Sequence, residues 1–294
     1  MNQWTEIADC ISAATGNKFT VENSRSVGGG CINQGYVISN GEANYFVKLN
    51  SASLSEMFVA EAKGLQQIAS TKTIKVPQPI VWGTVENSAY LVMEYLDLGK
   101  GKSNWKEMGK QLAKMHRYPI TNGEVKFGWD LNNTIGSTPQ INDWMNDWGD
   151  FFAKYRIGYQ LKLAKKKGGN FPQSEALLSA IPKILTNHQP QPSLVHGDLW
   201  GGNADFTSSG EPTIFDPATY IGDREVDLAM TELFGGFPRE FYQAYESEFP
   251  LTPGYPQRKI LYNLYHILNH FNLFGGSYAS QANSTIAKLL TSDF

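Results

Sequence analysis

Two aspartates and an asparagine in the C-terminal half have types and spacing suited to phosphoryl transfer from a nucleotide. Asp198 follows His196 and Gly197, Asn203 comes five residues after Asp198, and Asp216 comes thirteen residues after Asn203. Asp198 can accept or orient the proton of an attacking hydroxyl group, and Asn203 and Asp216 offer neutral and anionic oxygens to Mg²⁺. The alternative is that the aspartates only cap turns, but a pattern of this kind rarely arises by chance.

A lysine in the N-terminal part could clamp the phosphates of that nucleotide. Lys48 stands in the middle of the alternating run 44–50, on the same face as Phe46. Glu61, in the helix-like stretch that follows, is the candidate partner for its ammonium group. The alternative is that Lys48 is a solvated residue at a sheet edge.

A run of three glycines upstream favours the phosphate-binding interpretation. Gly28, Gly29 and Gly30 let backbone amides approach phosphate oxygens without a clash with Cβ atoms, although a plain hairpin has the same signature. Further along, a chain crossing between two lobes would expose backbone N–H and C=O groups to an adenine edge at Met93, Glu94, Tyr95 and Leu96.

Aromatic and imidazole side chains are candidates for substrate contact. Trp200 lies two residues after Asp198 between glycine-containing segments, where its indole would form a flat wall for a sugar ring or simply pack. His266 and His270 have a spacing that could place two imidazoles on one metal. Because no nearby Glu or Cys completes a zinc set, packing or polarity of a substrate pocket is favoured, and His270 becomes a substrate candidate.

Cys31 could be a redox-sensitive thiol. It lies next to the three glycines, where backbone amides and Lys48 would favour the thiolate and lower the pKa of the thiol. The alternative is an inert small residue. Cys10, on the opening helix, is expected to matter less.

The elements that must position these residues differ between the two ends of the chain. The first 95 residues predict a twisted sheet with one helix inside it: an opening helix over 4–11, strands at 44–50, 79–85 and 89–95, and a helix over 56–69. Beyond residue 95, helical patterns dominate, at 105–116, 143–164, 223–236, 238–249 and 257–274. This order predicts an α+β chain of two lobes, 1–95 and 96–294, with a cleft between them.

Composition narrows the class of protein. Of 294 residues, 41% are hydrophobic and 18% charged, which is enough for a core and excludes a disordered chain. The net charge of −3 disfavours a nucleic-acid partner, because such proteins carry positive charge for the phosphates. No run of apolar residues is long enough to predict a membrane span. Two cysteines and the lack of a signal peptide predict a protein of the cytoplasm.

The motifs together resemble the fructosamine kinases (ketoamine kinases), a branch of the protein-kinase-like and aminoglycoside-phosphotransferase-like fold. The resemblance rests on VGGGCINQGY, YFVK, EAKGL, VHGDLWGGN, IFDPA, GDREVDLAM and LFGGF, and extends to the C-terminus. One departure is Asn33, which stands where a third glycine of the phosphate loop would be.

The resemblance implies a role for each matching residue. Asp198 corresponds to the catalytic aspartate, Lys48 and Glu61 to the phosphate-binding pair, and Asn203 and Asp216 to the Mg²⁺ ligands. Asp227 corresponds to the acid that braces the catalytic loop. The implied fold is a bilobal protein-kinase-like one, with an N-terminal antiparallel sheet lobe that carries one key helix and a larger, mainly helical C-terminal lobe.

The implied activity is an ATP- and Mg²⁺-dependent transfer of phosphate to a sugar hydroxyl, typically O3, of ketoamines, which are fructose- or ribulose-type adducts of free or protein-bound amines. One alternative is a kinase for another hydroxylated amine, such as an aminoglycoside or choline. A second is a nucleotide-binding pseudokinase with a regulatory role, which the intact Lys48, Asp198, Asn203 and Asp216 disfavour.

Overall fold

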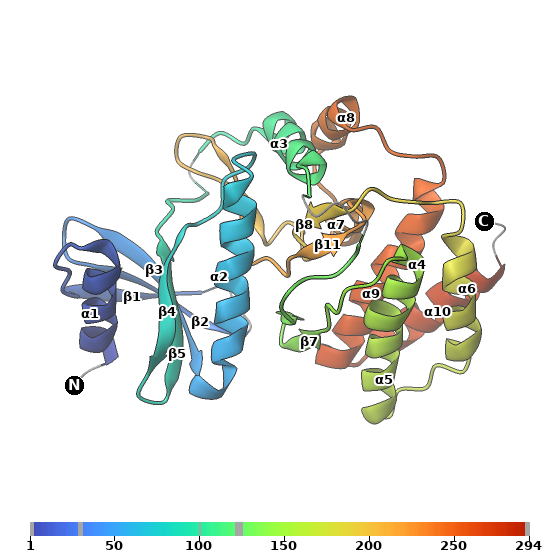
Figure 1. Ribbon diagram of the computed structural model, residues 1–294, viewed down its shortest axis with the longest axis horizontal. Helices are drawn as coiled ribbons and strands as arrows, with labels where there is room; N and C mark the ends of the chain where they lie inside the picture. The colour runs from blue at the N-terminus through green and yellow to red at the C-terminus, as the bar shows by residue number, and fades with distance from the viewer. Residues whose placement is uncertain (1–2, 29–31, 100, 121–125, 292–294) are drawn as a thin grey trace. The chain divides into compact units, whose positions relative to one another are not determined.

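The computed structural model describes residues 3–28, 32–99, 101–120 and 126–291, and the chain packs into two units. The first unit consists of Met1–Asn104 together with Ala204–Asp216, and the second of Trp105–Asn203 together with Pro217–Phe294. Strands dominate the first unit and helices the second (Figure 1), so the predicted α+β class is confirmed.

A five-stranded antiparallel sheet forms the centre of the first unit. Its strands run in the order β1-β2-β3-β5-β4, with bounds β1 (Asn23–Val27), β2 (Gln34–Ser39), β3 (Asn44–Ser51), β4 (Pro79–Val85) and β5 (Ser88–Glu94). The three strands predicted from alternation correspond to β3, β4 and β5. In β3, Val47 and Leu49 are buried on one face and Lys48 points to the other, as the alternation requires.

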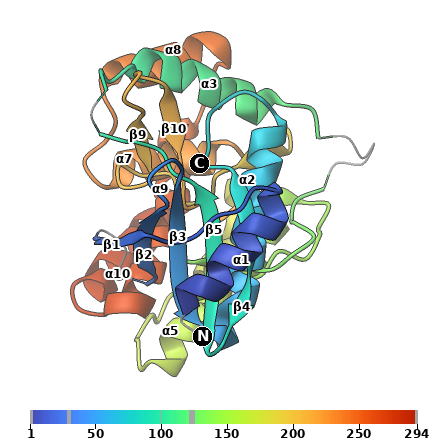
Figure 2. The same ribbon diagram turned by 90° about the vertical axis from the view of Figure 1, so that its left-hand side faces the viewer.

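Two helices cover the two faces of this sheet. Helix α1 (Gln3–Thr15) buries Ile7, Ala8 and Ile11 in a cluster that includes Val47 and Leu49, and it lies in front of the sheet in Figure 2. Helix α2 (Ser55–Ser70), preceded by the 3₁₀ turn η1 (Ala52–Leu54), lies on the other side of the sheet from α1 (Figure 1). The face that carries Lys48 is therefore the α2 face.

The segment Ala204–Asp216 adds a hairpin to this unit. It contains β9 (Ala204–Phe206) and β10 (Pro212–Ile214), which pair antiparallel. The N–H of Ile214 donates to the carbonyl of Lys75 at 3.1 Å, and the N–H of Gly99 donates to the carbonyl of Phe206 at 3.1 Å. These bonds fix Asp216, two residues beyond β10, within the sheet unit.

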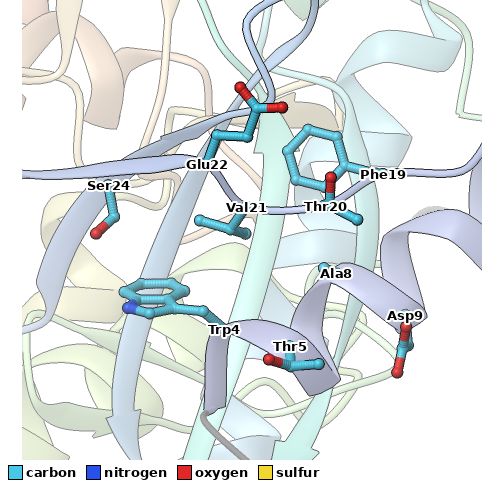
Figure 3. Close-up of a pocket in the computed structure, with 9 residues that line it drawn as sticks. All are labelled: Trp4, Thr5, Ala8, Asp9, Phe19, Thr20, Val21, Glu22 and Ser24. Atoms are coloured by element: carbon cyan, nitrogen blue, oxygen red, sulfur yellow. The ribbon is translucent and has the colours of Figure 1, made fainter.

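A pocket of about 360 Å³ lies between α1 and the segment that leads into β1 (Figure 3). None of the candidate site residues lines it. Its wall consists of Trp4, Thr5, Ala8, Asp9, Phe19, Thr20, Val21, Glu22 and Ser24.

The second unit is mainly helical. Helices α3 (Trp105–Arg117) and α8 (Arg239–Glu248) lie side by side in Figures 1 and 2. The other helices are α4 (Trp148–Phe151), the π-helical segment η2 (Phe152–Gly158), α5 (Tyr159–Lys166), α6 (Ser174–Ile184), α7 (Glu225–Leu233), α9 (Tyr255–Phe274) and α10 (Tyr278–Thr291). In the described part of the chain, no helix has the length and apolar character needed to cross a membrane.

The predicted helix 143–164 begins later in the structure than the sequence indicates. The aromatic spacing predicts a helix over 143–164, but the helical segment begins only at Trp148. The carboxylate of Asp147 accepts a hydrogen bond from the N–H of Asp150 at 2.8 Å and so caps the first turn. Helix α6, which contains Pro182, was not predicted.

Two short antiparallel strand pairs interrupt the helices of this unit. They are β6 (Asn133–Ile135) with β7 (Thr138–Gln140), and β8 (Ser193–Val195) with β11 (Tyr220–Gly222). Strand β8 ends directly before His196, and Tyr220 pairs with Val195. The β8–β11 pair therefore presents the candidate catalytic loop.

Candidate active site

Lys48 forms a double ion pair within the sheet unit. Its Nζ lies 2.6 Å from Glu61 Oε1 and 2.6 Å from Asp216 Oδ1. Only 8% of the lysine side chain is exposed, against 45% for Asp216. Burial acts to lower the pKa of Lys48, but the two carboxylates outweigh it and raise the pKa above its ordinary value, so the ammonium stays charged. The structure thus joins three of the predicted residues.

Asp216 has an unusual backbone conformation. Its φ is 57°, in the left-handed region that few residues other than glycine adopt. Asp and Asn tolerate this region best, at a cost of about 1–2 kcal/mol. The turn directs Oδ1 to Lys48 and leaves nearly half of the carboxylate surface open to a ligand. Backbone strain of this kind is often found where a side chain is held for function.

The residues predicted to meet the adenine edge lie at the end of β5. Met93 pairs with Phe46, two positions along the ladder from the pair of Lys48 with Leu91. Glu94 is the last residue of the strand, and Tyr95 and Leu96 follow it without regular structure. The structure thus places Met93 and Glu94 on the sheet that carries Lys48, and Tyr95 and Leu96 directly after it.

The glycine-rich segment is described only in part. Gly28 follows β1 directly, and an added Cβ there would meet no atom within 4 Å. Gly29, Gly30 and Cys31 lie outside the described residues. Their predicted phosphate-binding and redox roles stay predictions.

Asp227, on α7, holds the backbone of the candidate catalytic loop in the second unit. Its Oδ2 accepts a hydrogen bond from the N–H of His196 at 2.7 Å, and its Oδ1 accepts one from the N–H of Gly197 at 2.8 Å. Its side chain has no exposed surface. The contact agrees with the role that the resemblance implies for this residue, because it fixes the two residues directly before Asp198.

His116 and Tyr245 extend this contact, and sequence reasoning missed both. His116 Nε2 lies 3.0 Å from Asp227 Oδ2, and His116 Nδ1 lies 2.7 Å from the hydroxyl of Tyr245. Burial raises the pKa of Tyr245, so its hydroxyl stays protonated and donates. His116 Nδ1 therefore accepts, and Nε2–H donates to the carboxylate. The only signal in the sequence is a histidine on the apolar side of the predicted helix 105–116.

Asp198 and Asn203 meet in the same loop. Asn203 Nδ2 donates to the backbone carbonyl of Asp198 at 2.8 Å and lies 3.3 Å from its Oδ2. Since the amide nitrogen of Asn203 is committed to Asp198, Oδ1 is the atom left to bind a cation. The amide oxygen and the carboxylate are both hard ligands of the kind that Mg²⁺ prefers.

A glycine is required between His196 and Asp198. Gly197 has φ of 82°, and an added Cβ would lie 2.2 Å from the carbonyl oxygen of Ala218. The N–H of Ala218 in turn donates to the carbonyl of His196 at 2.8 Å. The candidate catalytic loop is thus packed directly against the segment 217–219 that leads into β11.

The two substrate candidates share one aromatic neighbour. The rings of Trp200 and Phe234 are 6.2 Å apart, and those of Phe234 and His270 are 4.9 Å apart. Trp200 is 40% exposed. Burial lowers the pKa of His270, and its Nδ1–H donates to the carbonyl of His266 at 2.8 Å. The neutral ring therefore keeps Nε2 as an acceptor.

The two histidines do not form a metal centre in the described structure. Burial lowers the pKa of His266 to about 3, so it stays neutral. Among the described residues, the one group of His, Cys, Asp or Glu close enough to hold an ion is His188 with Asp223 and Glu225, and it includes neither His266 nor His270.

Comparison with known proteins decides the family. A model of the fructosamine kinases matches residues 3–292. The chain belongs to this family. It is 54% identical to a probable ketoamine kinase of Synechocystis sp., over 98% of this chain and 97% of that protein. It is 42% identical to the chloroplastic protein-ribulosamine 3-kinase of Arabidopsis thaliana, over 89% of this chain and 80% of that protein.

Solved structures agree with this family. A crystal structure assigned as a fructosamine-3-kinase of Haemophilus somnus superposes with a TM-score of 0.90 at 32% identity, over 98% of both chains. A choline kinase of Streptococcus pneumoniae matches with a TM-score of 0.63 at 16% identity, over the whole of both chains, which shows the fold alone. The predicted resemblance and the protein-kinase-like fold are confirmed, and this fructosamine kinase is a phosphotransferase that acts on a sugar hydroxyl.

The contacts of Asp227 predict a pH-dependent stability. Burial acts to raise its pKa, but the contacts with His116 and with the backbone of His196 outweigh burial and lower the pKa below the ordinary value. A lowered pKa contributes stability above the unfolded value, about 3.9, and that stability is lost as pH falls through the folded pKa. Asp227→Asn should therefore lower Tm at pH 7, and the difference from wild type should narrow below about pH 4.

Thermal unfolding between pH 7 and pH 3 measures this effect. Asp150→Asn, at an exposed position on α4, makes the same charge change as a control and should alter Tm little. A Tm difference for Asp227→Asn that stays constant down to pH 3 would show that the effect does not come from the charge.

Proposed function

We propose that this fructosamine kinase transfers the γ-phosphoryl group of ATP to a hydroxyl group, at position 3, of the sugar part of a ketoamine. The observation that carries the proposal is the double ion pair of Lys48 with Glu61 and Asp216, in a chain of this family. A buried lysine with two carboxylate partners has the charge needed to hold nucleotide phosphates while remaining protonated.

We assign the binding of ATP to the sheet unit. Lys48, held by Glu61, would contact the phosphates, and the glycines at 28–30 would offer backbone N–H groups to them. Met93, Glu94, Tyr95 and Leu96 would offer backbone groups to the adenine edge. This assignment is supported by their location at the end of β5, where Met93 lies two ladder positions from Leu91, the strand partner of Lys48.

We assign the binding of Mg²⁺ to Asn203 and Asp216. The donor set fits this ion, because Asp216 keeps 45% of its side chain exposed and Asn203 has its amide oxygen free of the bond to Asp198. When bound, Mg²⁺ offsets the negative charge that develops on the transferred group. Lys48 keeps the carboxylate of Asp216 in place through Oδ1.

Asp198 is the residue to which we assign the proton of the sugar hydroxyl. Asn203 bonds to its backbone carbonyl, and Asp227 bonds to the two N–H groups directly before it. The carboxylate is thus carried by a loop with little freedom, and it would orient the attacking hydroxyl in line with the phosphorus. Positioning and charge stabilisation supply most of the catalysis in such reactions, and no covalent enzyme intermediate is required.

Trp200 and His270 are the residues to which we assign the sugar. The exposed indole offers a flat apolar surface, and Nε2 of the neutral imidazole can accept a hydrogen bond from a sugar hydroxyl. The relative from Arabidopsis is named a protein-ribulosamine 3-kinase, which supports a ribulose or fructose adduct of an amine as substrate. From the two cysteines we further infer a cytoplasmic location.

The proposal predicts the effect of Asp198→Asn. The variant should bind ATP nearly as wild type does but lower kcat by about 10²–10⁴-fold, because it removes a positioned acid–base group. A panel of fructosyl- and ribulosyl-amines with ATP, read by the mass shift and by the position of the new phosphate, provides the assay.

Two results of this assay would contradict the proposal. The first is near-normal turnover of Asp198→Asn, which would remove Asp198 from the mechanism. The second is a wild-type protein that phosphorylates none of the ketoamines. Glu240→Gln, at an exposed position of α8, is the control and should retain full activity.

Asp216→Ala is expected to abolish nucleotide binding that depends on Mg²⁺. It removes one assigned ligand but leaves Lys48 its bond to Glu61.

Lys48→Met should instead affect turnover more than folding, because the Glu61 left in the buried site can take up a proton. Calorimetric titration of ATP with and without Mg²⁺, together with Tm, measures both. A collapse of Tm in both variants would assign these residues a structural role.

Trp200→Ala should raise KM for the ketoamine by about 3- to 10-fold, the equivalent of one aromatic contact, with KM for ATP unchanged. Trp144→Ala is the matched control, because its indole is exposed to a similar degree, 37%, and contacts Asp130 instead. Equal values of KM in wild type and Trp200→Ala would exclude the indole from sugar binding.

A further inference from the structure

Arg156 is a buried cation whose hydrogen bonds all go to neutral oxygens in the described structure. Its side chain has no exposed surface. Nη1 donates to the carbonyls of Ile141 at 2.8 Å and Tyr155 at 3.3 Å, and Nη2 donates to Asn142 Oδ1 at 2.7 Å. An arginine stays protonated even when buried, so it cannot escape the cost of burial by losing its charge. A buried guanidinium that bonds only to neutral oxygens is costly, and this cost points to a role beyond packing.

The backbone around Arg156 is also unusual. Arg156 lies in the π-helical segment η2, and π-helical turns are rare and often found at functional sites. The wide turn depends on Gly158, where an added Cβ would lie 2.8 Å from the carbonyl oxygen of Ala153. The turn brings the guanidinium over the ring of Tyr220, with 4.0 Å from Cζ to the ring centroid.

A chain of buried amides leads from Arg156 towards the catalytic loop. Asn142 Nδ2 donates to Asn133 Oδ1 at 2.9 Å. Asn133 Nδ2 donates to the carbonyl of Thr219 at 2.8 Å. Gln140 Nε2 donates both to Asn133 Oδ1 at 2.8 Å and to the carbonyl of Ala218 at 3.0 Å.

The cation anchors one end of this chain. A guanidinium has only donors, so Asn142 presents its oxygen to Arg156 and its nitrogen to Asn133. The carbonyls of Leu131, Thr219 and Ala218 accept from the amide nitrogens and agree with this orientation. A side chain at 156 without a donor would leave the buried Oδ1 of Asn142 without this bond, and the first amide of the chain would lose the contact that holds it.

The amide chain and the stacking on Tyr220 both connect Arg156 with the backbone next to the loop that carries Asp198. The carbonyl of Ala218 is packed against Gly197, and the N–H of Ala218 bonds to the carbonyl of His196. Tyr220, on which the guanidinium stacks, is the strand partner of Val195. The amide chain and the ring therefore support the segment next to the loop, through contacts separate from those that Asp227 makes with its N–H groups.

We propose that Arg156 is a positioning residue of the phosphoryl-transfer site: it anchors the Asn142 end of the Asn142–Asn133–Gln140 chain, which holds Ala218 and Thr219 and thereby the loop that presents Asp198. The inference rests on the proposed function of Asp198. It assigns Arg156 no contact with substrate or nucleotide.

Arg156→Met tests the proposal, because it keeps much of the side-chain volume and removes every donor. We expect kcat to fall by about 10–100-fold, as for a catalytic group that is slightly misplaced, with KM for ATP within about twofold of wild type. Arg156→Lys, which retains a cation that can donate to Asn142, should recover part of the lost kcat.

Ile157→Ala is the control for a loss of stability alone. Ile157 is the next residue on the same segment, is fully buried and has no polar group. Its loss of a core side chain should lower Tm but leave kcat near the wild-type value at a temperature where the variant is folded. A kcat for Arg156→Met as high as that of Ile157→Ala would overturn the proposal.

Asn142→Asp keeps the proposal testable if Arg156→Met does not fold. The carboxylate still accepts from Arg156 and supplies a counter-ion, but it cannot donate to Asn133 Oδ1 or to the carbonyl of Leu131, which Asn142 Nδ2 reaches at 3.0 Å. We expect a folded protein with reduced kcat. Unchanged kcat in this variant would also overturn the proposal.

Hydrogen exchange separates this proposal from the proposed function. The amides of Gly197 and Ala218 should exchange faster in Arg156→Met than in Ile157→Ala, whatever the substrate is. If wild type phosphorylates no ketoamine but exchange rises as expected, the proposed function fails and the positioning role stands. If wild type is active and neither kcat nor exchange changes in Arg156→Met, the positioning role fails and the function stands.

Discussion

The buried carboxylate of Asp227 makes the contacts on which the loop that carries Asp198 depends. It has no exposed surface and accepts hydrogen bonds from the N–H groups of His196 and Gly197. These groups belong to a turn with a left-handed glycine, where no regular ladder could satisfy them. One ionised side chain therefore replaces secondary structure at this point, and His116 with Tyr245 keeps that side chain in the correct ionisation and orientation.

The sheet unit contains a buried positive charge, the ammonium group of Lys48. An ammonium group in the middle of a strand must be neutralised after it leaves water, and two carboxylates from distant parts of the chain do so at 2.6 Å each. Glu61 is buried with Lys48, whereas Asp216 remains half open. The two carboxylates thus differ. Glu61 is enclosed together with the ammonium group of Lys48, whereas Asp216 can also face a ligand.

Local sequence patterns predict much of the sheet unit and part of the candidate site. Alternation around Lys48 predicted β3 and the face of the lysine, and the positions of Asp198 and Asn203 on one loop follow from their short separation. Asp216, by contrast, meets Lys48 across 168 positions of the chain, and no pattern in the sequence predicted that ion pair. Arg156, Asn133, Gln140 and Asn142 were missed, because isolated amides and a single arginine have no periodic signal until the fold brings them together.

The division of the chain has a consequence for how such a protein can be cut or recombined. The sheet unit is discontinuous, and its second segment, Ala204–Asp216, lies between Asn203 and Pro217 of the helical unit. A fragment that stops at Asn104 would keep the five strands and both helices. It would lack Asp216, so that Lys48 would keep only Glu61 of its two carboxylate partners. Neither unit can be inherited, exchanged or expressed as one contiguous piece with its full set of charged residues.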